Sequence, residues 1–214
     1  MRTHALIAMI VGLSSVPMGL TASQPVSEQA APASQREKIF VFAKAEVTEK
    51  DRIDPRVYLS TDQLRAGESH RFAVVIDIAP GWHINTNLKR PTFIIPTQVN
   101  LEGKLETTIA AIDFPRGKSF QIDGLDEPLT VYENQVILFG NLEVPREAAG
   151  QTEELEFSLR YQLCNDAQCL APKTLKLKGA ASVVGANAPT RAINGELFKR
   201  DRNRQNASAG RRGS

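Results

Sequence analysis

The chemistry that this sequence can support centres on its two cysteines, Cys164 and Cys169. Cysteine thiolates exchange disulfides, act as nucleophiles and bind soft metal ions. Four residues separate the pair, and the 214-residue chain has no other cysteine. In an oxidising compartment each thiol must therefore bond either to the other one or to a partner protein.

A structural role for this pair is the first alternative to weigh. In the loop-entropy model, a disulfide that closes about six residues stabilises a fold by about 2 kcal/mol, against nearly 5 for a loop of about 100 residues. A domain of this length can also bury enough surface to fold without a disulfide. The spacing therefore favours a redox-active pair, in a fold that survives reduction. The other hypothesis is a binding module in which this loop disulfide is structural.

Metal binding is the second alternative, because cysteines at this spacing can serve as zinc ligands. Three histidines accompany them: His4 lies in the expected leader, and His70 and His83 lie far upstream of the cysteines. A zinc site needs more ligands than this arrangement brings together. We expect no metal and no cofactor other than the disulfide itself.

Asp166 lies between the two cysteines and is a candidate catalytic residue. A carboxylate there would raise the pKa of a nearby thiol and could give a proton to a leaving sulfur. Aspartate is equally a common turn residue. Both interpretations stay open.

The segments around the cysteines alternate apolar and polar residues, which predicts strands with one buried face. The alternation is clear over Phe72–Ile78, over Leu155–Leu163 and around Leu175. The cysteine pair thus lies in or beside a hairpin loop. Because the apolar set occupies odd positions up to Leu163, Cys164 is expected on the opposite face, toward solvent.

The rest of the chain reads as further short strands separated by turns that contain glycine or proline. No helical stripe of comparable length competes. The pattern predicts an all-β, immunoglobulin-like antiparallel β-sandwich. The additional strands are expected at Ile39–Val47, Val57–Ser60, Ile94–Leu101, Leu105–Ile112, Leu129–Tyr132 and Val136–Val144.

The two ends differ in composition from the expected domain at 39–185. An apolar run behind Arg2, followed by small residues, predicts a cleaved signal peptide at 1–23 and export to the periplasm. Polar residues at 24–38 predict a disordered linker, and 186–214 a disordered basic tail. The remaining chain is mildly acidic, so a nucleic-acid surface on the fold is not expected.

Tyr161–Pro172 resembles the cysteine hairpin of the N-terminal periplasmic domain of the thiol:disulfide interchange protein DsbD and related copper-sensitivity suppressor proteins. Pro80–Asn85, Ile95–Thr97 and Val131–Glu133 resemble further landmarks of that family, in the same order. The resemblance covers roughly 45–179. It does not include the family's membrane-embedded or thioredoxin-like domains.

This resemblance implies a thiol–disulfide relay, acting as an interchange component or protein-disulfide reductase. Reducing equivalents would pass from a membrane-linked or thioredoxin-like donor to periplasmic disulfide oxidoreductases and cytochrome c maturation factors. Cys164 and Cys169 would be the redox pair, with Cys169 forming the mixed disulfide. We expect a monomer whose electron donor is a separate chain.

The resemblance also implies a cap loop that shields the cysteines, expected between Phe120 and Tyr132. Its candidate residues are Phe120, Leu125, Asp126 and Glu127. Upstream, we interpret Trp82 and His83 as packing residues, which is the commoner role of such side chains at a strand edge.

Overall fold

The part of the chain that the computed structural model describes comprises residues 39–48, 51–89, 93–122, 127–199 and 201. The leader predicted at 1–23 and the linker predicted at 24–38 lie outside these residues. All of the described residues belong to one compact unit. Within its described residues, no helix combines the length and the apolar character needed to cross a membrane.

Alternating side chains build the long strands of this unit, as the sequence predicts. In β11 (Thr152–Tyr161) the odd-numbered residues from 155 to 161 are buried, and the polar residues between them are half-buried or exposed. β4 (Ser69–Ile78) and β13 (Lys173–Val184) are the other long strands. Because successive side chains of a strand point to opposite faces, this pattern directs one face of β11 into the core.

The other elements are shorter. They are β1 (Ala43–Lys44), β2 (Ile53–Leu59), β3 (Leu64–Arg65), β5 (His83–Asn85), β6 (Gln98–Gly103), β7 (Thr108–Asp113), β8 (Lys118–Phe120), β9 (Leu129–Glu133), β10 (Gln135–Glu143), the 3-10 helix η2 (Arg146–Ala148) and β12 (Leu163–Cys164).

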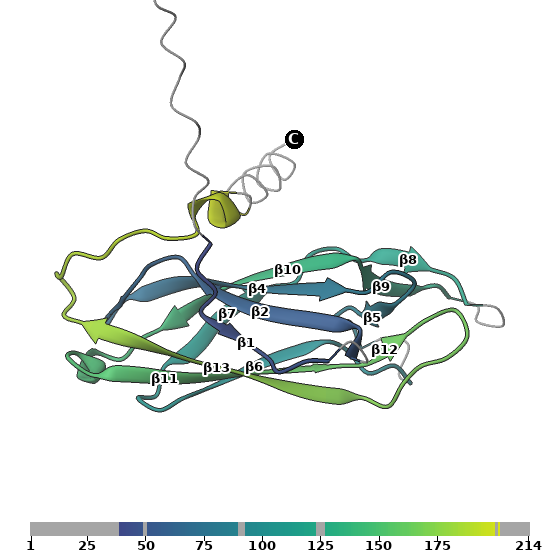
Figure 1. Cartoon of the computed structure of the whole chain (residues 1–214), viewed down its shortest axis with the longest axis horizontal. Coiled ribbons are helices and arrows are strands. Elements are labelled where there is room, and N and C mark those ends of the chain that lie inside the picture. The colour runs from purple at the N-terminus through teal and green to yellow at the C-terminus, as the bar shows by residue number, and fades with distance from the viewer. Residues whose placement is uncertain (1–38, 49–50, 90–92, 123–126, 200, 202–214) are drawn as a thin grey trace, which may run out of the picture. The chain divides into compact units, whose positions relative to one another are not determined.

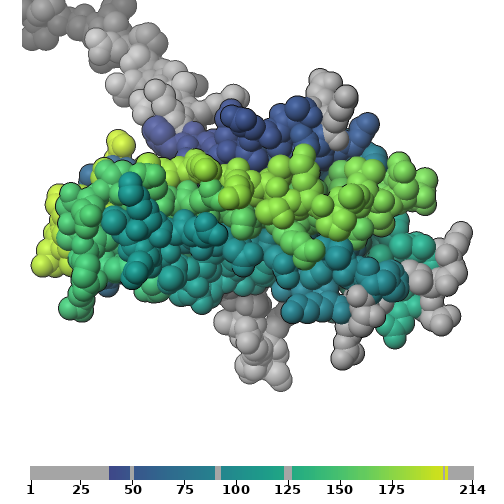
Figure 2. All heavy atoms as spheres, turned by 90° about the horizontal axis from the view of Figure 1, so that it is seen from below, coloured from purple at the N-terminus to yellow at the C-terminus, as the bar shows by residue number. Residues whose placement is uncertain are grey.

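The larger sheet has the order β6-β11-β13-β1-β2-β4-β10-β7, and β3 pairs in parallel with β13. The two-residue β1 lies in its middle, and there the sheet folds over into two layers (Figure 1). Phe72 of β4 and Phe157 of β11 meet between the layers, with ring centroids 5.3 Å apart. Figure 2 shows β13, β11 and β6 side by side in the lower layer. The prediction of an all-β, immunoglobulin-like antiparallel sandwich is confirmed.

A second, four-stranded sheet of order β12-β5-β9-β8 lies at one end of the sandwich (Figure 1). It joins segments that are far apart in the sequence. Ile84 of β5 and Leu163 of β12 are opposite each other and bury their side chains in the main core. This sheet positions the cysteines.

Some elements differ from the predicted ones. The strand expected at 39–47 is reduced to β1, because Ile39, Phe40 and Val41 are exposed. The strand expected at 94–101 begins only at Gln98. β5 and β8 were not predicted, because three residues are too few to show an alternation.

The described part of the predicted tail, 186–199 and 201, packs against the sandwich rather than being disordered. The side-chain amide of Asn194 donates to the carbonyl oxygens of Phe40 and Leu59 at 3.0 and 2.9 Å. Residues 195–199 are helical, and Phe198 is buried, with its ring 5.9 Å from that of Phe139 (Figure 1). One aromatic side chain with a complementary surface fixes a segment whose composition alone predicts disorder.

Candidate functional site

Cys164 and Cys169 form a disulfide across a tight hairpin beside the small sheet. β12 pairs with β5, which places Cys164 opposite His83. The Leu170 amide then donates to the Leu163 carbonyl at 2.8 Å, so the two cysteines lie opposite each other with their Cα atoms 4.0 Å apart. Of the two pairings that the sequence left open, the structure has the intramolecular one.

The loop between the cysteines is held by Asn165. Its side-chain oxygen accepts hydrogen bonds from the amides of Ala167 and Gln168 at 3.0 and 2.9 Å. Its own amide donates to the Gln168 carbonyl at 2.9 Å. This is the turn chemistry expected of asparagine. Asp166 is exposed at the tip of the loop, where a partner can reach it.

The two cysteines differ sharply in exposure. Cys169 is exposed, whereas Cys164 is only 3% exposed. The prediction that Cys164 faces solvent is therefore wrong. Strand parity correctly placed Cys164 and Leu163 on opposite faces, because only Leu163 belongs to the main core. The face on which Cys164 lies is nevertheless covered, because β12 pairs with β5 in the small sheet and Cys164 lies opposite His83.

His83 is a site residue that the sequence reasoning missed. It lies in β5, between Cys164 on β12 and Glu133 on β9, and is 3% exposed. Its ring contacts that of Phe120, with centroids 4.2 Å apart. Burial lowers the pKa of the imidazole, against smaller raising effects of Glu133 and Asp166. The only available signal was its place among the family landmarks. Trp82, in contrast, packs against the core as predicted.

The candidate cap residues have different positions. Phe120 ends β8 and is half-buried, against His83. Together with its two neighbours up to Ile122, it lines a hollow of about 600 Å³ whose other wall is the cysteine loop from Asn165 to Cys169. Glu127 is exposed, and Leu125 and Asp126 lie outside the described residues. The structure thus brings Phe120, but not Glu127, into contact with the surroundings of the cysteines.

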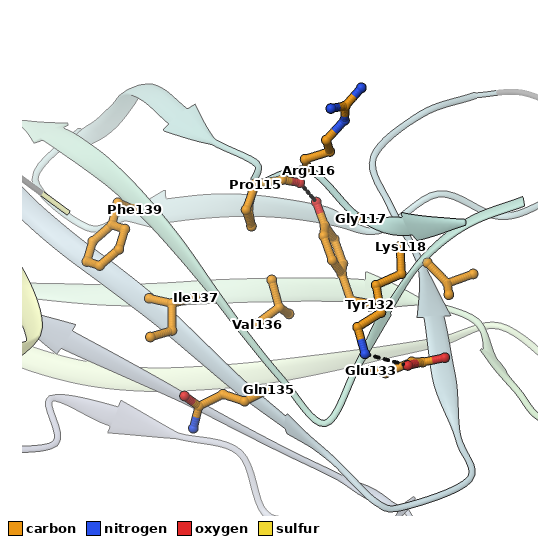
Figure 3. Close-up of a pocket in the computed structure, with 11 residues that line it drawn as sticks. Pro115, Arg116, Gly117, Lys118, Tyr132, Glu133, Gln135, Val136, Ile137 and Phe139 are labelled. Atoms are coloured by element: carbon orange, nitrogen blue, oxygen red, sulfur yellow. Dashed lines mark hydrogen bonds and ion pairs between the residues drawn. The ribbon is translucent and has the colours of Figure 1, made fainter. Parts of the chain in front are cut away.

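A second hollow, of about 320 Å³, lies between β8, β9 and β10 (Figure 3). The Tyr132 hydroxyl donates to the Pro115 carbonyl at 2.7 Å, which holds the chain before β8 against β9. Lys118 binds Glu133 with a nitrogen–oxygen distance of 2.9 Å (Figure 3). Glu133 lies opposite His83, which in turn lies opposite Cys164, so this ion pair lies at the end of a row of three paired residues.

The sequence of this domain matches a family model. The model describes the N-terminal domain of the thiol:disulfide interchange protein DsbD, and it matches residues 55–180, more than half of the chain. The chain belongs to this family. The matched residues include the small sheet and the whole cysteine hairpin, so the resemblance stated for the hairpin is confirmed. The protein is a member of a thiol–disulfide interchange family.

Solved structures show more distant likenesses. The N-terminal periplasmic domain of ScsB from Proteus mirabilis is 13% identical, with a TM-score of 0.49 over 76% of this chain. This chain spans 58% of the length of that one. The GAE domain of GGA2p from Saccharomyces cerevisiae is 9% identical, with a TM-score of 0.36 over 64% of this chain and 96% of that one. No curated protein matches the sequence.

Proposed function

We propose that this domain relays reducing equivalents in the periplasm by thiol–disulfide exchange at Cys164 and Cys169. The donor would be a membrane-linked or thioredoxin-like protein, and the acceptors would be oxidised periplasmic proteins. The observation that carries the proposal is the asymmetric pair, with one exposed and one buried sulfur, in a hairpin of a DsbD-family domain.

The asymmetry supports a different step for each sulfur. In the reduced domain, the Cys169 thiolate attacks a partner disulfide, forming a mixed disulfide and releasing one partner thiolate. Cys164 then attacks the Cys169 sulfur, so the domain disulfide forms and the second partner sulfur leaves. Two electrons have passed to the partner. Reduction by a donor dithiol runs the same steps in reverse.

The surroundings of the cysteines support this assignment. A partner disulfide can approach Cys169, because the loop from Asn165 to Cys169 is accessible along one wall of the hollow. Phe120 on the other wall covers His83 and thereby the buried side of the pair. We propose that the segment ending in Phe120 shields Cys164, leaving Cys169 as the point of contact.

Redox titration of the disulfide tests the proposal against a purely structural bond. Equilibration with glutathione and with thioredoxin should give a reduction potential above roughly −300 mV, below which structural disulfides tend to lie. A bond that resists both reagents would support a binding module with a passive disulfide instead.

Partner trapping tests the assignment of steps. A Cys164→Ala variant should accumulate a mixed disulfide through Cys169 with a thioredoxin-like protein in periplasmic extract, since the resolving thiol is absent. The matched Cys169→Ala variant keeps only the buried thiol and should trap much less. Equal trapping by both variants would contradict the assigned roles.

A further inference from the structure

Three side chains form a row across the small sheet. Cys164 of β12, His83 of β5 and Glu133 of β9 are directly opposite one another on neighbouring antiparallel strands. Residues opposite each other in such strands point to the same face, with Cβ atoms about 4.5–5.5 Å apart. The imidazole of His83 is therefore the side chain beside Cys164, and it is an acid–base group.

The imidazole of His83 is held where it can exchange a proton. It is buried and lies against the Phe120 ring, so solvent does not compete for it. Within the part of the chain that the structure describes, its Nε2 atom has no hydrogen-bond partner. A neutral imidazole carries one unprotonated nitrogen, which can accept a proton.

The charged groups around His83 come from three elements. Glu133 faces it from β9 and Asp166 from the cysteine loop, and both raise its pKa, whereas burial lowers it more strongly. Lys118 of β8 binds Glu133 and offsets that carboxylate's charge. The balance leaves the ring neutral, as a base, near neutral pH.

The buried cysteine needs such a base. Its attack on Cys169 requires a thiolate, and burial away from water disfavours a thiolate relative to a thiol. An exposed thiol can lose its proton to water, but a thiol that is 3% exposed has to pass its proton to a neighbouring side chain. His83, opposite Cys164 on β5, is an acid–base group placed to take it.

We propose that His83 is the proton-transfer residue for Cys164 in this exchange. As the Cys164 sulfur bonds to the Cys169 sulfur, its proton moves to the imidazole, and the bond between Cys169 and the partner breaks with its electron pair on the partner sulfur. When a donor thiolate instead attacks Cys169, Cys164 leaves as a thiolate and takes the proton back. The inference rests on the proposed function and adds a residue to its site.

A small-molecule disulfide allows the attack by Cys169 and the later attack by Cys164 to be timed separately. The reduced domain is mixed with 5,5′-dithiobis(2-nitrobenzoic acid), whose coloured thiolate is released once when Cys169 attacks and again when Cys164 closes the domain disulfide. In a His83→Gln variant near neutral pH, the second release should slow by about tenfold or more, since general-base catalysis contributes at least this much. The first release should change by less than about twofold.

The chain provides a matched control. His70 is also buried and burial also lowers its pKa, but it lies in β4 and binds the Arg65 amide. A His70→Gln variant should keep both releases at the wild-type rates. Second-release rates in His83→Gln that equal the wild-type rates, or both releases slowed alike, would overturn the inference.

Two further readouts separate proton transfer from a structural role. In the wild type, the second release should level off above the pKa of His83, whereas in His83→Gln it should keep rising with pH. Added imidazole should accelerate the second release in His83→Ala but not in the wild type; no acceleration would count against the inference. A slowed second release in His83→Gln, together with a wild-type disulfide that resists glutathione, would refute the proposed relay and still support proton transfer by His83, because the two exchange steps would remain.

Discussion

At the scale of single residues, the two cysteines should differ in reactivity as they differ in exposure. In Cys164→Ala the remaining Cys169 is exposed, and in Cys169→Ala the remaining Cys164 is buried beside His83. Alkylation by a maleimide near neutral pH should therefore be at least about tenfold slower in Cys169→Ala. Mass spectrometry of timed samples measures both rates. Equal rates in the native state would show that Cys164 is not shielded.

Asn165 should matter more for stability than its neighbour. Asn165→Ala removes the oxygen that accepts the Ala167 and Gln168 amides, which should lower the free energy of unfolding by about 1 kcal/mol. Asp166→Ala, at the exposed tip of the same loop, should change it by less than about 0.5 kcal/mol. Urea unfolding measures both. A larger loss in Asp166→Ala would mean that the turn depends on that carboxylate.

The sequence locates the cysteine pair, but not its surroundings. The hairpin is local, so the alternation on both sides of the cysteines could predict it. The sequence left the pairing of the two thiols open, and strand parity placed Cys164 wrongly toward solvent. The cover over Cys164 comes from β5 and β8, which are distant in the chain and have three residues each. No periodicity reveals which short segment pairs with β12, and for this reason His83 was interpreted as a packing residue.

At the scale of elements, an ion pair ties the start of β13 to the segment before β2. Asp51 binds Lys173 and also accepts from the Thr48 amide at 2.7 Å. The bond to Lys173 has the largest effect and the bonds to Thr48 add to it, and together they lower the pKa of the Asp51 carboxyl from 3.8 to about 2. A lowered pKa in the folded state adds stability above the unfolded pKa, and this is lost as pH falls through the folded value.

The Asp51→Asn variant should show this pH dependence. At pH values above about 4, it should unfold more easily than the wild type, by no more than about 1 kcal/mol for a solvent-screened pair. The difference should shrink as pH falls from about 4 toward 2, because the wild-type carboxyl then also loses its charge. Denaturant unfolding across this range measures it. A difference that stayed constant with pH would exclude the carboxylate charge as its cause.

Alternation predicts the long strands well and the short ones poorly. β11 and β13 carry clear patterns because one face of each lies on the core. The strand expected from Ile39 to Val47 is reduced to β1, because its first three residues are exposed and only Ala43 and Lys44 pair with neighbouring strands. The folding of the sheet is a property of its pairing order, which no local pattern contains.

At the scale of the whole molecule, the C-terminal segment adds to stability. Phe198 is 5% exposed and packs with Phe139 of β10 and Ala73 of β4, outside the main core. Phe198→Ala should lower the free energy of unfolding by about 2 kcal/mol, the value of burying such a side chain. Leu197→Ala, at a half-buried neighbour, should cost less. An unchanged unfolding midpoint in Phe198→Ala would indicate that the segment does not hold this position in solution.

The whole fold should withstand reduction of its disulfide. Neither cysteine belongs to the main core cluster of the described residues, which is built around Phe72 and Phe157. Reduction should lower the free energy of unfolding by about 2 kcal/mol, the loop-entropy value for so short a loop, and leave the circular dichroism of the strands unchanged. The double variant Cys164→Ala/Cys169→Ala should have the stability of the reduced domain and no response to reductant. Unfolding on reduction would contradict a relay, because a relay must remain folded in both redox states.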